Sequence, residues 1–134
     1  MKIAGKWVFA ACLALPASVG TASADSFMFA YSTALSMTDA YSSRGVPLEG
    51  WCALLQQDRA NYHRFGKRDP DDEGDPFFTT PERRAMMTGK CKIAPGVFTD
   101  PGAQVRSGNR EFHLRVQIYG DGQRITRIRM TDAF

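Results

Sequence analysis

Two histidines are the residues of this chain that could most readily serve acid–base chemistry. His63 falls in a helical pattern and His113 on the polar face of a predicted strand, and the sequence has no other histidine. With Arg115, Arg127 or Arg129 holding a phosphate, an imidazole pair could cleave a phosphodiester. No spacing ties the two histidines together, and histidine is common on surfaces. We therefore favour two solvent-facing or capping side chains over a nuclease.

Asp58 is the most unusual acidic residue, because it falls on the apolar stripe of a predicted helix. A buried carboxylate is costly unless it is paired. In a cleft it could act as a general acid or base. We favour a structural role, either a hydrogen bond to Tyr62 one turn later or an ion pair with a basic side chain from the sheet.

An acidic segment at residues 69–75 begins like a calcium-binding loop. An EF-hand needs Gly at the sixth position and Glu at the twelfth. Gly74 fits the sixth position, but Thr80 occupies the twelfth. We favour a solvated acidic loop over a weak calcium site, and we expect no cofactor. The candidate metal ligands are Asp69, Asp71 and Glu73.

Arginines form the candidate binding surface. Arg127 and Arg129 lie on one face of the last predicted strand, and Arg115 is expected opposite them on the neighbouring strand. Such a ladder could dock an anionic partner, or it could keep an edge strand from pairing with another chain. From residue 83 onward ten basic residues stand against four acidic ones, so the C-terminal part of the chain is basic.

Residues 1–24 show the three parts of a secretory signal peptide: two lysines, an apolar run from Trp7 to Leu15, and small residues at 22–24. The run is shorter than the roughly 20 apolar residues of a membrane span. We predict that residues 25–134 are a single exported domain, periplasmic or extracellular, with no membrane span. A buried N-terminal helix of a cytosolic protein is the alternative.

Two cysteines, Cys52 and Cys91, lie in the predicted mature domain. An even number of cysteines in a small exported domain indicates a disulfide. Closing a loop of about 40 residues should stabilise the fold by about 4 kcal/mol in the chain-entropy model. Two free thiols or an intermolecular bridge are the alternatives.

Apolar residues at helical spacing predict helices in the N-terminal part of the domain. The first covers Phe27–Tyr41, the second runs from Pro47 to Gly66, and the third covers Thr79–Thr88 with Thr79 as its N-cap.

Alternating apolar and polar residues then predict strands at 112–118 and 124–131, joined by a tight turn at 120–122. A shorter strand is expected around 97–106. The predicted fold class is α+β, with two to three N-terminal helices packed on a small C-terminal antiparallel β-meander and one disulfide.

The charge and motif content favours a binding role. The net charge is +3, and two of the positive charges are in the leader, so the mature domain would carry only +1 and no nucleic-acid partner is expected. The sequence has no GxSxG, HExxH, phosphate-loop or dinucleotide-binding motif. We expect an inhibitor, immunity factor or envelope accessory protein whose partner is another protein of the cell envelope. The alternatives are a small secreted hydrolase using the two histidines and a structural envelope component.

Overall fold

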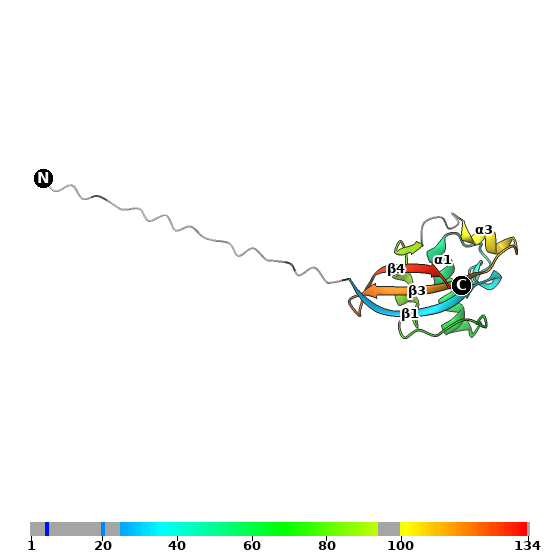
Figure 1. Cartoon of the computed structure of the whole chain (residues 1–134), viewed down its shortest axis with the longest axis horizontal. Coiled ribbons are helices and arrows are strands. Elements are labelled where there is room, and N and C mark those ends of the chain that lie inside the picture. The colour runs from blue at the N-terminus through cyan, green and yellow to red at the C-terminus, as the bar shows by residue number, and fades with distance from the viewer. Residues whose placement is uncertain (1–4, 6–19, 21–24, 94–99, 134) are drawn as a thin grey trace.

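The computed structural model describes residues 5, 20, 25–93 and 100–133, so the predicted leader lies almost entirely outside the described residues. The centre of the domain is a four-stranded mixed sheet with the strand order β1-β3-β4-β2 (Figure 1). One face of the sheet packs against the helix α1 (Trp51–Ala60), which agrees with the α+β class. The strands are β1 (Ser26–Leu35), β2 (Cys91–Ile93), β3 (Phe112–Gly120) and β4 (Ile125–Asp132).

The helix predicted for Phe27–Tyr41 is wrong, because these residues form β1 and a short 3-10 turn, Met37–Asp39. Strand β1 pairs antiparallel with β3 along its whole length, from Ser26 opposite Gly120 to Leu35 opposite Phe112. Its aromatic and β-branched residues suit a pleated, half-buried surface. Long-range pairing therefore decides the conformation of a segment whose apolar spacing also fits a helix.

The strands predicted at the C-terminal end are confirmed. In β3 the side chains of Phe112, Leu114, Val116 and Ile118 are buried and alternate with partly exposed ones. A turn leads from β3 into β4, and the two strands pair antiparallel. This hairpin is the middle of the sheet rather than the end of a meander.

The predicted simple meander is wrong, because β2 pairs parallel with β4 and closes the far side of the sheet. The prediction of a strand around 97–106 is also wrong for residues 100–106, which the structure describes. Most of these residues form the helix α3 (Pro101–Arg106). The Asp100 side chain accepts a hydrogen bond from the Ala103 backbone N–H at 3.0 Å, and Pro101 occupies the first turn, which together start a helix. Residues 94–99 lie outside the described residues.

The second predicted helix exists but begins later than expected. It starts at Trp51 after Gly50, and continues from α1 into a π-helical turn, Asn61–Phe65. Gly66 then takes the left-handed conformation, φ 64°, that ends the helix, as predicted. The third helix, α2 (Pro81–Ala85), is shorter than expected and is capped by Thr80 rather than Thr79.

The disulfide prediction is confirmed. Cys52 in the first turn of α1 is joined to Cys91 at the start of β2, with Cα atoms 5.5 Å apart. The bond therefore ties the helix to the strand at the edge of the sheet. The buried core lies between α1 and the sheet. Its residues include Tyr31, Leu35, Leu54, Leu55, Phe78, Val116, Ile118 and Ile128.

Candidate functional site

A buried ionic cluster holds two of the predicted catalytic candidates, Asp58 and His63. Its centre is Arg59, whose side chain is 0% exposed. The Arg59 Nε donates to Asp58 at 2.8 Å, and its Nη1 lies 3.2 Å from a carboxylate oxygen of Asp75. His63 Nε2 lies 2.7 Å from that same oxygen. Four ionisable groups therefore form one connected set inside the domain.

Two tyrosines enclose the Arg59 guanidinium. Its carbon lies 4.3 Å from the ring centroid of Tyr31 and 4.7 Å from that of Tyr62. A guanidinium between aromatic faces gains cation–π attraction where water is excluded. Arg59 also donates hydrogen bonds to the Thr33 hydroxyl and to the Glu73 carbonyl. Its guanidinium nitrogens therefore all have hydrogen-bond partners within the domain, as in a structural element, whereas the buried Tyr31 hydroxyl has none among the described residues.

Asp58 has a different partner from those expected for it. The ion pair is with the next residue of the same helix, rather than with Tyr62 or a basic residue from the sheet. Arg59 itself was missed by the sequence analysis. The available signal was its position beside Asp58 and upstream of an acidic loop, a combination that suits pairing.

Burial governs the titration of the acids around this cluster. Burial raises the pKa of Asp58 to about 7, although Arg59 beside it favours the charged form. Burial also raises the pKa of Asp39 to about 6, against hydrogen bonds from the Ser36 backbone N–H and the Asn61 amide. For Asp75, burial acts to raise the pKa, but hydrogen bonds from His63 and from two backbone N–H groups outweigh it and lower the pKa.

The contribution of Asp39 and Asp58 to the free energy of unfolding should fall as the pH rises from about 4 to about 7. Asp39 and Asp58 have folded-state pKa values above the usual 3.8, so in this range the folded state binds more protons than the unfolded state. Raising the pH then favours unfolding. Urea unfolding at a series of pH values should show a flatter dependence for Asp58→Asn than for the wild type. Asp132→Asn, at an exposed carboxylate, should keep the wild-type slope; equal slopes for Asp58→Asn and wild type would contradict the expectation.

The second histidine has separate partners. His113 on β3 lies 3.3 Å from Asp71 and 3.9 Å from Glu111, measured between ring nitrogen and carboxylate oxygen. His63 is bound to Asp75 instead. The described contacts therefore do not join the two imidazoles into one acid–base pair.

The acidic segment 69–75 lies along the outer edge of β1. The Asp72 carboxylate accepts from the Thr33 hydroxyl at 2.9 Å and the Ala34 backbone N–H at 3.0 Å. Glu73 accepts from the Ser32 backbone N–H at 2.8 Å and donates its own N–H to the Ser32 carbonyl. These bonds satisfy backbone groups that an edge strand leaves unpaired.

The candidate metal ligands Asp69, Asp71 and Glu73 are not gathered around one point. Asp71 is next to His113, and Glu73 binds Arg115 at 2.7 Å. Within the part of the chain that the structure describes, no three His, Cys, Asp or Glu side chains are placed to hold a metal ion.

The three arginines proposed for binding lie on the sheet face that points away from α1. We call this surface the open face. The larger side chains that register places there are Phe27, Lys92, His113, Arg115, Gln117, Tyr119, Arg127, Arg129 and Thr131.

Two rows of paired residues cross the open face. In one row Phe27, Tyr119 and Arg127 are register partners, with the Arg127 guanidinium carbon 3.8 Å from the Tyr119 ring centroid. In the next row Gln117 and Arg129 are partners, and Lys92 of β2 lies beside Arg129. Arg129 and Lys92 are both exposed. The structure therefore places two cations side by side on neighbouring strands.

The other two arginines of the open face are held at its margins. Arg115 is paired with Glu73 at 2.7 Å, and Arg127 with Asp25 at 3.0 Å. All four side chains of these two pairs are between 40% and 55% exposed, so the pairs contribute little to stability.

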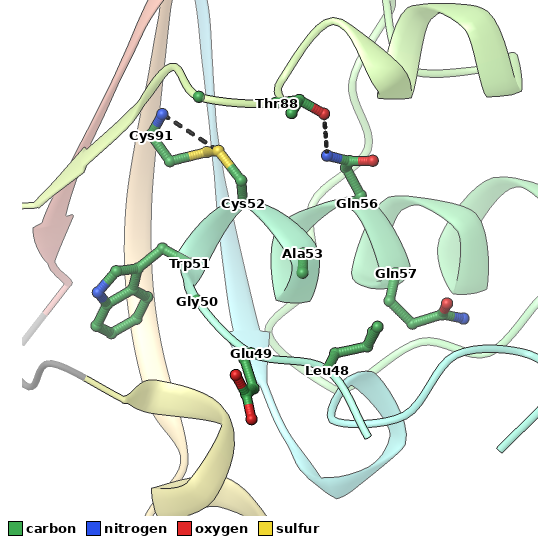
Figure 2. Close-up of a pocket in the computed structure, with 11 residues that line it drawn as sticks. Leu48, Glu49, Gly50, Trp51, Cys52, Ala53, Gln56, Gln57, Thr88 and Cys91 are labelled. Carbon is green, nitrogen blue, oxygen red and sulfur yellow. Dashed lines mark hydrogen bonds between the residues drawn. A yellow bond between two sulfur atoms is a disulfide. The ribbon is translucent and has the colours of Figure 1, made fainter. Parts of the chain in front are cut away.

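A cavity of about 580 Å³ lies beside the disulfide at the start of α1 (Figure 2). Trp51, Cys52 and Cys91 line it, and Gln56 donates to the Thr88 hydroxyl at 3.1 Å across its wall. Among the described residues that line it, Glu49 is the one carboxylate, and none is Lys, Arg or His.

Within the described residues no helix is both long and apolar enough to cross a membrane. Comparison with protein-family models, curated proteins and solved structures finds no match for this chain.

Proposed function

We propose that this chain is an exported, disulfide-stapled domain that binds another protein of the cell envelope through the open face of its sheet. The observation that carries the proposal is the adjacent pair of exposed cations, Lys92 and Arg129, next to the aromatic and guanidinium row of Phe27, Tyr119 and Arg127. Aromatic and arginine side chains are enriched in protein interfaces. The positive charge of Lys92 and Arg129 suits a partner surface rich in carboxylates.

Protection of an edge strand is a weaker explanation for Arg129. Strand β4 has neighbours on both sides at this position, because Arg129 is paired with Gln117 of β3 and with Lys92 of β2. A residue in the interior of a sheet does not need a charge to prevent edge-to-edge association. A binding role accounts for its exposure and for the second cation beside it.

A disulfide is consistent with export, because such bonds persist in oxidising compartments. The hydrolase alternative gains no comparable support, since His63 and His113 bind different carboxylates. An inhibitor, an immunity factor and an envelope accessory protein all fit a binding domain of this kind.

Charge reversal on the open face should weaken partner binding. The wild-type protein would be used to capture partners from an envelope extract, and the captured protein would then be purified and its binding kinetics measured. Arg129→Glu should reduce the association rate constant by about tenfold at low salt, because long-range attraction becomes repulsion. The difference should shrink in about 0.5 M salt, where charges are screened within a few ångströms.

Arg124→Glu is the matched control, because it makes the same charge change in the exposed β3–β4 turn. It should keep the wild-type association rate to within about twofold. Equal rates for Arg129→Glu and the wild type, or an equal loss in both variants, would contradict binding through the open face.

A further inference from the structure

Exposed apolar side chains gather on a second surface, away from the residues that define the open face. Among the residues that the structure describes, the large apolar side chains that are exposed are those of Phe27, Met37, Tyr41, Val46 and Phe65. Three of them, Met37, Tyr41 and Phe65, line one cavity of about 370 Å³. Val46, 55% exposed, belongs to the loop whose residues 42, 43 and 45 form the cavity wall. We call the four side chains Met37, Tyr41, Val46 and Phe65 the apolar patch.

Hydrogen bonds fix the loop that carries Tyr41 and Val46. The Ser42 N–H donates to the Val46 carbonyl at 2.8 Å, and the Ser42 hydroxyl accepts from the Val46 N–H at 3.1 Å. Tyr41 also forms a β-bridge with Pro47. The exposed side chains are therefore held on an ordered turn, which lowers the entropy that binding would cost.

The floor of the cavity is fixed as well. Asn61 is buried, and its amide donates to the Thr38 carbonyl at 3.1 Å and to Asp39 at 2.9 Å. Gln57 donates to the Asn61 side-chain oxygen at 2.9 Å. These bonds join the 3-10 turn to the long helix beneath the apolar patch. The cavity thus combines three large apolar side chains with polar lining residues that are fixed by hydrogen bonds, a combination that can orient a ligand.

Positive charge surrounds the apolar patch. Lys67 lines the cavity. Arg44 lies in the sequence between Ser43 and Gly45, which both line it. Arg64 places its guanidinium carbon 5.1 Å from the Phe65 ring centroid. Asp39, which lies in this region, is 2% exposed and already accepts a hydrogen bond from Asn61, so it does not offset these cations at the surface.

We infer that the apolar patch docks a peptide segment of a partner protein in which a large apolar side chain is flanked by carboxylates. The apolar side chain would enter the cavity between Met37, Tyr41 and Phe65, and the carboxylates would lie against Arg44 and Lys67. Large exposed apolar side chains that line one cavity mark a candidate interaction site. Charge complementarity selects an acidic segment over a basic or neutral one. The inference concerns a surface different from the open face and holds independently of it.

A displayed library of random short peptides tests this inference. The library would be selected on the purified, oxidised wild-type protein and counter-selected on Met37→Ser/Phe65→Ser. Enriched peptides should carry a large apolar residue flanked by Asp or Glu. A synthetic peptide of that sequence should bind the double variant at least about tenfold more weakly, because central apolar anchors dominate binding energy. Enrichment without acidic residues, or no enrichment, would overturn the inference.

Further variants separate the charge contribution and guard against misfolding. Both serine substitutions are at exposed positions, and circular dichroism would verify that the double variant is folded. Lys67→Gln should lower the affinity for the acidic peptide. It should have no effect on the affinity for a peptide whose carboxylates are replaced by amides. Arg129→Glu should leave peptide binding unchanged, so a failure of the open-face proposal remains distinguishable. Peptide affinity that is equal for the wild type and the serine variant would also overturn the inference.

Discussion

Arg59→Met should lower the free energy of unfolding by about 3–5 kcal/mol, the range for removing one partner of a buried ion pair. The methionine keeps most of the volume between Tyr31 and Tyr62. It leaves the carboxylates of Asp58 and Asp75 without the guanidinium that lies 2.8 and 3.2 Å from them. Denaturant unfolding followed by circular dichroism would measure the loss. This loss is a large fraction of the stability of a domain of this size.

Arg68→Ala is the control for Arg59→Met. The Arg68 guanidinium carbon lies 4.0 Å from the Tyr62 ring centroid, but the residue is exposed. Its removal should cost less than about 1 kcal/mol, as for cation–π contacts at exposed sites. Equal losses in the two variants would show that stacking on Tyr62, rather than buried ion pairing, is what Arg59 supplies.

Neutralising a partner should partly rescue the arginine variant. Asp58→Asn combined with Arg59→Met leaves fewer uncompensated charges, so the double variant should be more stable than the sum of the single losses implies. An additive result would mean that Asp58 and Arg59 do not interact in the folded state, contrary to their 2.8 Å contact.

Removing the disulfide should have an effect of similar size. Cys52→Ala/Cys91→Ala opens a loop with a sequence separation of 39 residues. The chain-entropy model gives about 4 kcal/mol for a loop of this length. Guanidinium unfolding of the wild type and the variant would measure the difference. Under reducing conditions the unfolding midpoint of the wild type should move toward that of the variant.

The alanine variant provides its own control for this measurement. It has no bond to reduce, so dithiothreitol should leave its unfolding midpoint unchanged. Wild-type protein whose midpoint is equally unaffected by full reduction would contradict a stabilising role for the bond between α1 and β2.

Local patterns predicted the elements whose signals lie within a few residues. The alternation in β3 and the Gly66 stop are of this kind, and the structure confirms them. The disulfide was predicted from the number of cysteines instead, and it is also confirmed. Asp100 followed by Pro101 was an equally local signal for the start of a helix, and it was overlooked in favour of a strand.

The errors concern features that depend on distant partners. Tyr31 and Leu35 are four residues apart, which fits a helix, but both are buried on a strand because β3 pairs beside them. The apolar patch brings Phe65 to Met37 and Tyr41, and no local periodicity encodes that meeting. Arg59 was overlooked for the same reason, since its partner Asp75 lies in a loop beyond the helix.

The pairing of β1 with β3 sets the order in which the domain can fold. The Ser26 hydroxyl donates a hydrogen bond to the Gly120 carbonyl, and the two residues are register partners. The first strand of the domain therefore pairs with a segment close to the C-terminal end of the sequence. Contacts between residues so far apart slow the search for the native topology. A polypeptide emerging from its N-terminus, from a ribosome or through a translocation channel, therefore cannot close this sheet until nearly all of it is free. Until then β1 exposes Tyr31 and Leu35 without their native neighbours, and exposed apolar surface on an unpaired strand favours aggregation.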